Sequence, residues 1–339
     1  MRTLLKLIFV VLLAAAGWLA YGLLLPAKPR SEFVMLRSGW STRRIAQELQ
    51  NAGAIRSARA FLIYHVVVSP KPLKAGEYRF AQPATALNVH RRIVAGDIYT
   101  HTVIIPEGYS IFDIAGVIEA AGLGSRDEFL ALAKSSATMV HDIDPQATSL
   151  EGYLFPDTYQ FTRTQTLTDM LHVMVRRFRQ EAKAIGLLNG HNEPGRVHRL
   201  VTMASIIEKE TGAAEERANV ASVYYNRLER RIALQADPTV IYAALLAGRY
   251  DGVIHQSDLQ FDSPYNTYRY AGLPPGPIAN AGRASLEAAL RPASTDFIYF
   301  VSDNAGRHRF ARSLEEHTHN VALYRRALTA AGSSGAAGK

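Results

Sequence analysis

Two glutamates at the end of an apolar segment, residues 201–211 (VTMASIIEKET), are the residues best suited to chemistry in this chain. If the segment is helical, Glu208 lies over Ala204 and Ser205, a face of small residues that a sugar can approach, and Glu210 lies over bulkier apolar residues. Apolar surroundings disfavour the charged form of a carboxyl, so that it can act as a general acid near neutral pH. The alternative is an ordinary solvated helix end, because charged side chains are rarely buried.

Three turn-rich segments carry hydrogen-bonding and aromatic side chains: residues 234–239 (LQADPT), 263–268 (SPYNTY) and 272–280 (GLPPGPIAN). Loops held by helices are where binding sites usually occur, although Asp-Pro, Ser-Pro and Pro-Gly are also ordinary turn formers. The candidates for contact with a substrate are Gln235, Asp237, Asn266, Tyr268, Ser205 and Glu210.

The elements that position these residues are mainly helical. From residue 167 onward, apolar residues recur with the period of an α-helix, and they predict helices over residues 167–184, 197–210, 215–230, 239–247 and 284–290. Residues 297–301 and 308–310 resemble a hairpin around residues 303–306, and Ser313 with Glu316 predicts a capping box that starts a last helix. The small, polar tail, residues 332–339, is expected to be disordered.

The first half of the chain contains an internal repeat. Gly39-Trp40-Ser41 recurs as Gly108-Tyr109-Ser110 at an offset of 69 residues, and matching apolar residues follow each copy. In each copy the serine can cap a helix and a later glycine can end it. Strand-like segments, residues 33–36, 77–80 and 102–105, flank these helices, so the repeat predicts small α+β modules.

The N-terminus carries an uncharged apolar run, residues 7–25, which is nearly long enough to span a bilayer core. A cleaved signal peptide is the alternative, since residues 14–16 are alanines that could form an A-x-A site. The run continues nine residues past Ala16 and includes Trp18 and Tyr21, which suit a membrane interface, and this favours an uncleaved anchor. Basic residues flank both ends of the run, so charge alone leaves its orientation open.

Composition excludes some classes of site. The chain has no cysteine, which rules out disulfides and thiolate metal sites. Its net charge of +8 suits anionic partners, but its arginine pairs lack the interleaved aromatics of a nucleic-acid platform, so no nucleic-acid partner is expected. His317 and His319 lack the spacing of metal ligands on a helix and an evident third ligand, and neither a metal nor a cofactor is expected.

Seven segments, in order along the chain, resemble the endolytic murein transglycosylase family, also called YceG-like or MltG proteins. These are EGYLFPDTY (151–159), ASIIEKET (204–211), YNRL (225–228), LQADPTV (234–240), SPYNTY (263–268), GLPPGPI (272–278) and YFVSDNAGRHRF (299–310). The resemblance implies Glu208 as the single catalytic carboxylate and an inner-membrane anchor with the bulk of the chain outside the cytoplasm. One departure is Arg231-Ile232, where the family more often has Gly-Met, and a local change in packing or groove shape is expected there.

The resemblance also implies a reaction. The bond between N-acetylmuramic acid (MurNAc) and N-acetylglucosamine (GlcNAc) would be cut by the C6 hydroxyl of the same MurNAc, forming 1,6-anhydro ends. Glu208 would first donate a proton and then take one back, while Gln235, Asp237, Asn266 and Tyr268 hold the sugar groups and stabilise positive charge. The rivals are a hydrolytic muramidase, with Asp237 as base, and a glycan-binding scaffold without catalysis.

The expected fold class is α+β. Residues 1–27 form the cytoplasmic tip and anchor, residues 28–100 a first small module, residues 101–150 a LysM-like module and residues 151–331 a mainly helical catalytic domain. The expected partners are peptidoglycan glycan strands, the membrane and, because the tether at residues 26–29 is short, murein synthases that make nascent strands. Whether the LysM-like modules bind glycan or serve as spacers is left open.

Overall fold

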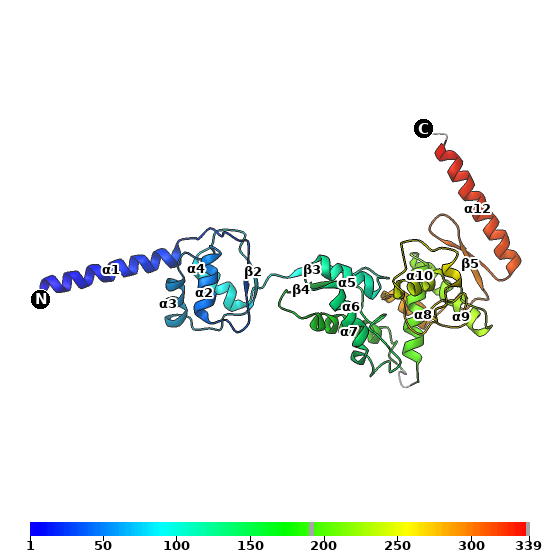
Figure 1. The fold of residues 1–339 in the computed structure, drawn as a ribbon, viewed down its shortest axis with the longest axis horizontal. Helices are drawn as coiled ribbons and strands as arrows, with labels where there is room; N and C mark the ends of the chain where they lie inside the picture. The colour runs from blue at the N-terminus through cyan, green and yellow to red at the C-terminus, as the bar shows by residue number, and fades with distance from the viewer. Residues whose placement is uncertain (190–192, 337–339) are drawn as a thin grey trace. The chain divides into compact units, whose positions relative to one another are not determined.

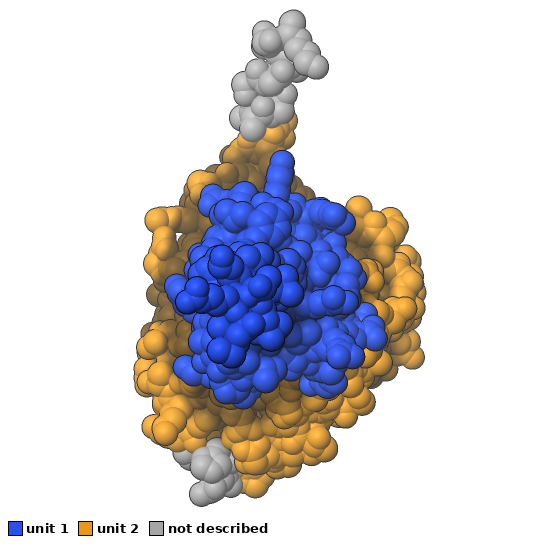
Figure 2. Space-filling model, turned by 90° about the vertical axis from the view of Figure 1, so that its left-hand side faces the viewer, with its two compact units in different colours: residues 1–102, 160–166 blue, residues 103–159, 167–339 orange. Residues whose placement is uncertain are grey.

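The computed structural model describes residues 1–189 and 193–336, and within them the chain is α+β, with twelve α-helices and three two-stranded sheets (Figure 1). It divides into two compact units, coloured separately in Figure 2. Unit 1 comprises Met1–Thr102 and Gln160–Thr166, and unit 2 comprises Val103–Tyr159 and Leu167–Lys339. The chain therefore passes between the units in two short strands, β3 (His101–Ile104) and β4 (Thr158–Phe161), which pair with each other.

Unit 1 begins with a long apolar helix, α1 (Arg2–Leu24), which is the single helix in the described part of the chain that is long and apolar enough to cross a membrane. The remainder follows the order strand, helix, helix, strand, helix: β1 (Phe33–Leu36), α2 (Thr42–Asn51), α3 (Ala58–Val67), β2 (Gly76–Arg79) and α4 (Ala86–Ala95). β1 and β2 are antiparallel, and Phe33 lies opposite Arg79. The core of the unit lies between this sheet and the helices.

The predicted repeat is confirmed at the level of helix capping. The Ser41 hydroxyl accepts a hydrogen bond from the Arg44 N–H at the start of α2, and Ser110 forms a full capping box at the start of α5 (Ile111–Ala120). Gly53 and Gly122 then take φ values of +73° and +66°, which favour glycine, directly after the two helices. A second helix follows each copy, α3 in the first and α6 (Arg126–Ser135) in the second.

Helix α8 is the centre of unit 2. The predicted helices are confirmed as α7 (Leu167–Ala184), α8 (Arg196–Glu210), α9 (Arg217–Glu229), α10 (Asp237–Leu246) and α11 (Arg283–Leu290). Every residue of α8 from Leu200 to Ile207 is buried, because α9, α10 and α11 all pack against it. A helix that is apolar on all sides is stable only when it is surrounded in this way.

The predicted hairpin is also confirmed, as antiparallel β5 (Tyr299–Ser302) and β6 (His308–Ala311). The last helix, α12 (Leu314–Ala336), starts after Ser313, whose hydroxyl accepts from the Glu316 N–H. The Glu316 carboxylate accepts from the Arg312 N–H instead of that of Ser313, so the capping box is displaced by one residue. α12 also runs into the tail that was expected to be disordered, whose last residues, 337–339, lie outside the described residues.

Arg231, where the resemblance favours glycine, has a φ of +58°. This is the left-handed region, which costs a non-glycine residue about 1–2 kcal/mol. The chain therefore keeps the backbone conformation that suits glycine at this turn and tolerates its cost.

Candidate active site

Glu208 and Glu210 leave the end of α8 on opposite sides of the helix. Residues two positions apart on an α-helix are separated by about 200° of rotation, so their side chains point to nearly opposite sides. Their surroundings in the structure differ accordingly. Glu210 lines a cavity, whereas Glu208 is held in a cluster of charged groups.

The cavity beside Glu210 has a volume of about 290 Å³ and lies wholly within unit 2. Four of the six residues predicted to contact substrate line it: Glu210, Gln235, Asp237 and Tyr268. The loops before α10 and after Ser263 therefore meet beside Glu210 at the end of α8. The complete lining is Glu210, Tyr224, Arg227, Leu234, Gln235, Asp237, Tyr268, Phe300 and His317.

The position of Glu210 changes its acidity. The pKa of Glu210 is raised to about 7, chiefly by burial and in part by the negative charge of Asp237. A hydrogen bond with Tyr224 and the positive charge of Arg227 act in the opposite direction. A carboxyl with a pKa near 7 can hold a proton and release it at neutral pH, which is what a general acid and base requires.

Asp237 and Gln235 are held in place by the 263–268 loop. The Tyr268 hydroxyl donates to Asp237 Oδ1 at 2.5 Å. The Gln235 N–H donates to the Thr267 carbonyl, and Gln235 has a φ of +51°. A non-glycine residue in this conformation stores about 1–3 kcal/mol of strain, and such strain is concentrated at functional sites. The strained backbone places Gln235 on the wall of the cavity.

Arg227 supports the opposite wall. Its guanidinium donates to the Ile298, Ala233 and Leu234 carbonyls, at 2.7, 3.1 and 2.9 Å, and lies over the Tyr299 ring. One side chain thereby ties α9 to the 233–234 turn and to the start of the β5 hairpin.

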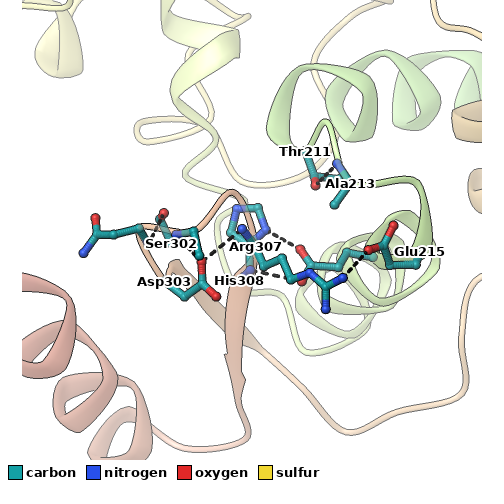
Figure 3. A network of polar contacts seen from close by, with 10 residues as sticks. Thr211, Ala213, Glu215, Ser302, Asp303, Arg307 and His308 are labelled. Carbon is teal, nitrogen blue, oxygen red and sulfur yellow. Dashed lines mark hydrogen bonds and ion pairs between the residues drawn. The ribbon is translucent and has the colours of Figure 1, made fainter. Parts of the chain in front are cut away.

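The β5–β6 hairpin is fixed at its other end by the segment that follows α8 (Figure 3). Glu216 accepts from the His308 N–H and from His308 Nδ1, and Arg307 pairs with Glu215 at 2.9 Å. Glu216 and His308 are largely buried, so this contact resists screening by salt better than the exposed pair does. The hairpin is the element that brings Phe300 to the cavity.

Glu208 lies in a different environment. Its side chain is 5% exposed, accepts from the Gly282 N–H at 2.9 Å and pairs with Arg217 at 3.3 Å. Glu107 approaches the same guanidinium at 3.8 Å, and burial together with the charge of Glu208 raises the pKa of Glu107. Glu208 thus binds the N-terminal end of α11 and the start of α9, and both of its oxygens already have partners.

Two of the predicted contact residues are buried and hold the scaffold. The Ser205 hydroxyl donates to the Thr202 carbonyl and accepts from the Ile278 N–H, with no exposed surface. The Asn266 amide, equally buried, donates to the Asp258, Leu259 and Phe261 carbonyls and accepts from the Tyr268 N–H. As placed, neither can touch a sugar, and each positions a loop instead.

Five cavity residues were not among the predicted contacts: Tyr224, Arg227, Leu234, Phe300 and His317. Three of them, Arg227, Leu234 and Phe300, lie inside segments that carry the family resemblance, so the sequence could have indicated them as site residues. Tyr224 precedes such a segment by one residue. His317 stacks on Tyr299, and its Nδ1 has no hydrogen-bond partner among the described residues. The described residues also contain no group of three or more side chains that could hold a metal.

A second buried carboxyl, Glu151, joins the start of α5 to the loop before α11. It accepts from the Ile111 N–H at the start of α5 and from the Asn280 amide at 2.9 Å. Burial raises the pKa of Glu151 from 4.5 to about 8, against the lowering effect of the hydrogen bonds from Ile111 and Tyr242. At neutral pH this carboxyl therefore takes up a proton when the protein folds.

This proton uptake makes stability fall as the pH rises. Below pH 4.5 the folded and unfolded states both carry the proton, and above about pH 8 neither does. Between these limits only the folded state binds the proton, so the free energy of unfolding falls by about 1.4 kcal/mol for each unit of rising pH. The glutamine of Glu151→Gln cannot ionise, so this contribution to the pH dependence is lost. As the pH rises through this window, the unfolding midpoint of the wild type, measured by circular dichroism, is expected to fall relative to that of the variant. Parallel curves for the two proteins would contradict the assignment.

Comparisons with known proteins place the chain in one family. The profile of the YceG-like family matches residues 34–323. The chain is 34% identical over 299 residues to the endolytic murein transglycosylase of Bacillus subtilis, covering 84% of this chain and 82% of that protein. It is 28% identical to the endolytic murein transglycosylase of Streptococcus pneumoniae, covering 93% of this chain and 64% of that protein. The crystal structure of a yceG-like protein from Listeria monocytogenes matches with a TM-score of 0.57 and 34% identity, over 86% of this chain and 99% of that one.

Proposed function

The chain belongs to the YceG-like family, and from this premise we propose that it is an endolytic murein transglycosylase whose proton donor is Glu210. The observation that carries the choice of residue is the cavity, where a carboxyl with a pKa of about 7 lies among Gln235, Asp237 and Tyr268. The expectation from the resemblance was Glu208. Both carboxylate oxygens of Glu208 already have partners, the Gly282 N–H and the Arg217 guanidinium, and this favours a structural role for Glu208.

The proposed reaction needs one carboxyl that acts twice. Protonated Glu210 gives its proton to the glycosidic oxygen as the bond from C1 of MurNAc to O4 of GlcNAc breaks. The C6 hydroxyl of the same MurNAc attacks C1, the C1–O6 bond closes the anhydro ring, and the hydroxyl proton returns to Glu210. No water is consumed, and the enzyme ends in its starting protonation state. The tethered nucleophile supplies a high effective concentration.

The other cavity residues have proposed roles that follow from their chemistry. Asp237, held by Tyr268, faces the site as the anion that stabilises positive charge developing on the sugar ring. The Gln235 amide can both donate to and accept from an N-acetyl group. The Nδ1 of His317, for which no described residue is a hydrogen-bond partner, is a further group that a bound sugar could satisfy.

A hydrolytic muramidase is the second candidate, because Asp237 provides another carboxyl in the same cavity that could activate water. The products distinguish the two. Digestion of purified murein by the detergent-solubilised full chain is expected to give 1,6-anhydro-MurNAc ends by mass spectrometry. Reducing ends, heavier by one water, formed at the same rate as cleavage would identify a hydrolase. If no new ends form, neither enzyme activity is present, and a glycan-binding scaffold without catalysis is the remaining function.

The proposed location follows from α1. Its length and apolar composition support a single-pass inner-membrane anchor with the N-terminus in the cytoplasm and the rest of the chain outside it. A short tether would keep the enzyme near newly polymerised strands, so we propose that it acts on nascent glycan beside murein synthases. We also propose a LysM-like module at residues 101–150, and the order β3, α5, α6, followed by β4 just beyond it, supports this module.

A further inference from the structure

Helix α3 of unit 1 exposes apolar side chains that the fold does not cover. Its sequence, ARAFLIYHVV, contains one charged residue, and Ala60 and Phe61 face the core with no exposed surface. On the other side, Ile63, Val66 and Val67 are 45%, 66% and 74% exposed, and Val68, just beyond the helix, is 65% exposed. Positions 63, 66 and 67 share one face of the helix. A contiguous apolar face of this kind in a folded unit marks a contact surface.

The first turn of α3 packs directly on α1. A Cβ atom added to Gly22 would lie 2.7 Å from the Ala60 Cβ and 3.2 Å from the Ser57 Cβ, so the approach requires glycine. Arg56, just before α3, donates to the Tyr21 hydroxyl at 3.1 Å and to the Pro26 carbonyl at 2.8 Å. These contacts fix the position of α3 along the axis of α1.

This position corresponds to the edge of a bilayer. At 1.5 Å per residue, the apolar run of residues 7–25 reaches about 28 Å, close to the hydrocarbon thickness of a membrane. Gly22 lies three residues before the end of that run, so the first turn of α3 is about 5 Å inside the boundary. Tyr21, which is 52% exposed, suits the same interfacial layer.

The arrangement within unit 1 agrees with this depth. In Figure 1, α3 lies at the end of unit 1 where α1 enters, and β2 lies at the other end. Arg59 is exposed, and it lies one helical turn before Ile63 on the same side of α3. Lys71 is exposed shortly after Val68. Cations that flank an apolar face favour contact with anionic lipid headgroups.

We propose that α3 is an interfacial membrane helix, whose apolar face, Ile63, Val66, Val67 and Val68, inserts into the outer leaflet of the bilayer that α1 spans. The inference rests on the proposed anchoring by α1. A helix across the end of the anchor gives unit 1 a second point of attachment.

The absence of cysteine allows the test to be made with single labels on the full chain. Val67→Cys reports on α3 and Leu12→Cys on α1, and Ser38→Cys, in the exposed polar turn between β1 and α2, is the comparison within unit 1. Each variant is labelled with an environment-sensitive fluorophore and reconstituted into phosphatidylethanolamine and phosphatidylglycerol vesicles. Nitroxide-labelled lipids then quench a label that lies in the bilayer. Quenching at Val67 and Leu12 several-fold above that at Ser38 is the expected result.

The outcomes separate the two proposals. Quenching at Leu12 with none at Val67 would overturn the interfacial role of α3 and leave the anchor intact. No quenching at Leu12 would overturn both. Shielding at Val67 that appears only when the vesicles are crowded with protein would show that a second copy covers α3, and would also overturn the inference. Val67 is exposed, so its replacement is not expected to disturb folding.

Discussion

Glu210→Gln is expected to lower the rate of anhydro-end formation by about 10²–10⁴-fold, the usual contribution of general acid–base catalysis. Glutamine keeps the size and hydrogen-bonding capacity of the side chain, but it cannot give a proton to the leaving oxygen or recover one from the C6 hydroxyl. Glu210 is the cavity carboxyl whose pKa, raised by burial to about 7, fits both steps. Turnover of purified murein, followed by mass spectrometry of the new ends, measures the effect.

Glu208→Gln is the matched control, because the two glutamates differ by two positions on one helix and receive the same change. Loss of the Glu208 charge leaves Arg217, whose side chain is 9% exposed, without its closest anionic partner. Removal of one partner from a buried pair is costly, so the expected effect is a lower unfolding midpoint with most of the turnover per folded molecule retained. The reverse pattern, with Glu210→Gln active and folded Glu208→Gln inactive, would return the catalytic role to Glu208.

The pH dependence provides an independent check on the same assignment. If Glu210 must be protonated before cleavage, turnover should decline as the pH rises through about 7, the pKa set by its burial. The free enzyme and the complex can differ, so kcat/KM is the quantity that reports Glu210 in the empty cavity.

Local features of the sequence predicted much of the fold. Serine caps and the glycines that end helices act through neighbouring residues, so Ser41, Ser110 and Gly122 could be assigned from the chain alone. The helical period of apolar residues predicted both ends of α7 correctly and the start of α8 to within one residue. The hairpin followed from two β-rich segments around a turn.

The choice between Glu208 and Glu210 could not be made in this way. A small-residue face near Glu208 suggested room for a sugar, and in the structure the Glu208 carboxylate contacts the Gly282 N–H and Arg217, which come from two distant segments. The cavity beside Glu210 is likewise made by Arg227 and by the β5 hairpin. Helical period tells which residues share a face, and only the tertiary fold tells what lies opposite that face.

The buried positions of Ser205 and Asn266 show the same limit. Polar residues in a turn-rich segment can bind a ligand or satisfy the backbone of the loop itself, and the composition is the same in both cases. The structure places Asn266 in the second class, since its amide holds three carbonyls of residues 258–261. Its effect on the cavity is indirect, through the backbone of Tyr268.

Asn280→Ala is expected to be among the most destabilising single changes in unit 2. The Asn280 side chain has no exposed surface, accepts from the Leu154 N–H at 2.9 Å and donates to Glu151 and to the Tyr109 carbonyl, each at 2.9 Å. Alanine leaves these groups buried without partners, at a cost of about 1–3 kcal/mol for each unsatisfied group. A total of about 3 kcal/mol would lower the unfolding midpoint by roughly 6–12 °C in a unit of this size.

Asn51→Ala, at the exposed end of α2, tests whether the effect comes from burial of the amide and not from the residue type. Asn51 accepts one hydrogen bond, from Gln47 at 3.2 Å, in contact with solvent, so water can replace the lost partner and the midpoint should change little. Asn280 joins the turn before α5, the segment before β4 and the loop before α11, three segments that pack around the end of α8. If both variants melt with the wild type, the Asn280 amide does not hold these segments together, and the rigidity of the site must come from apolar packing around α8.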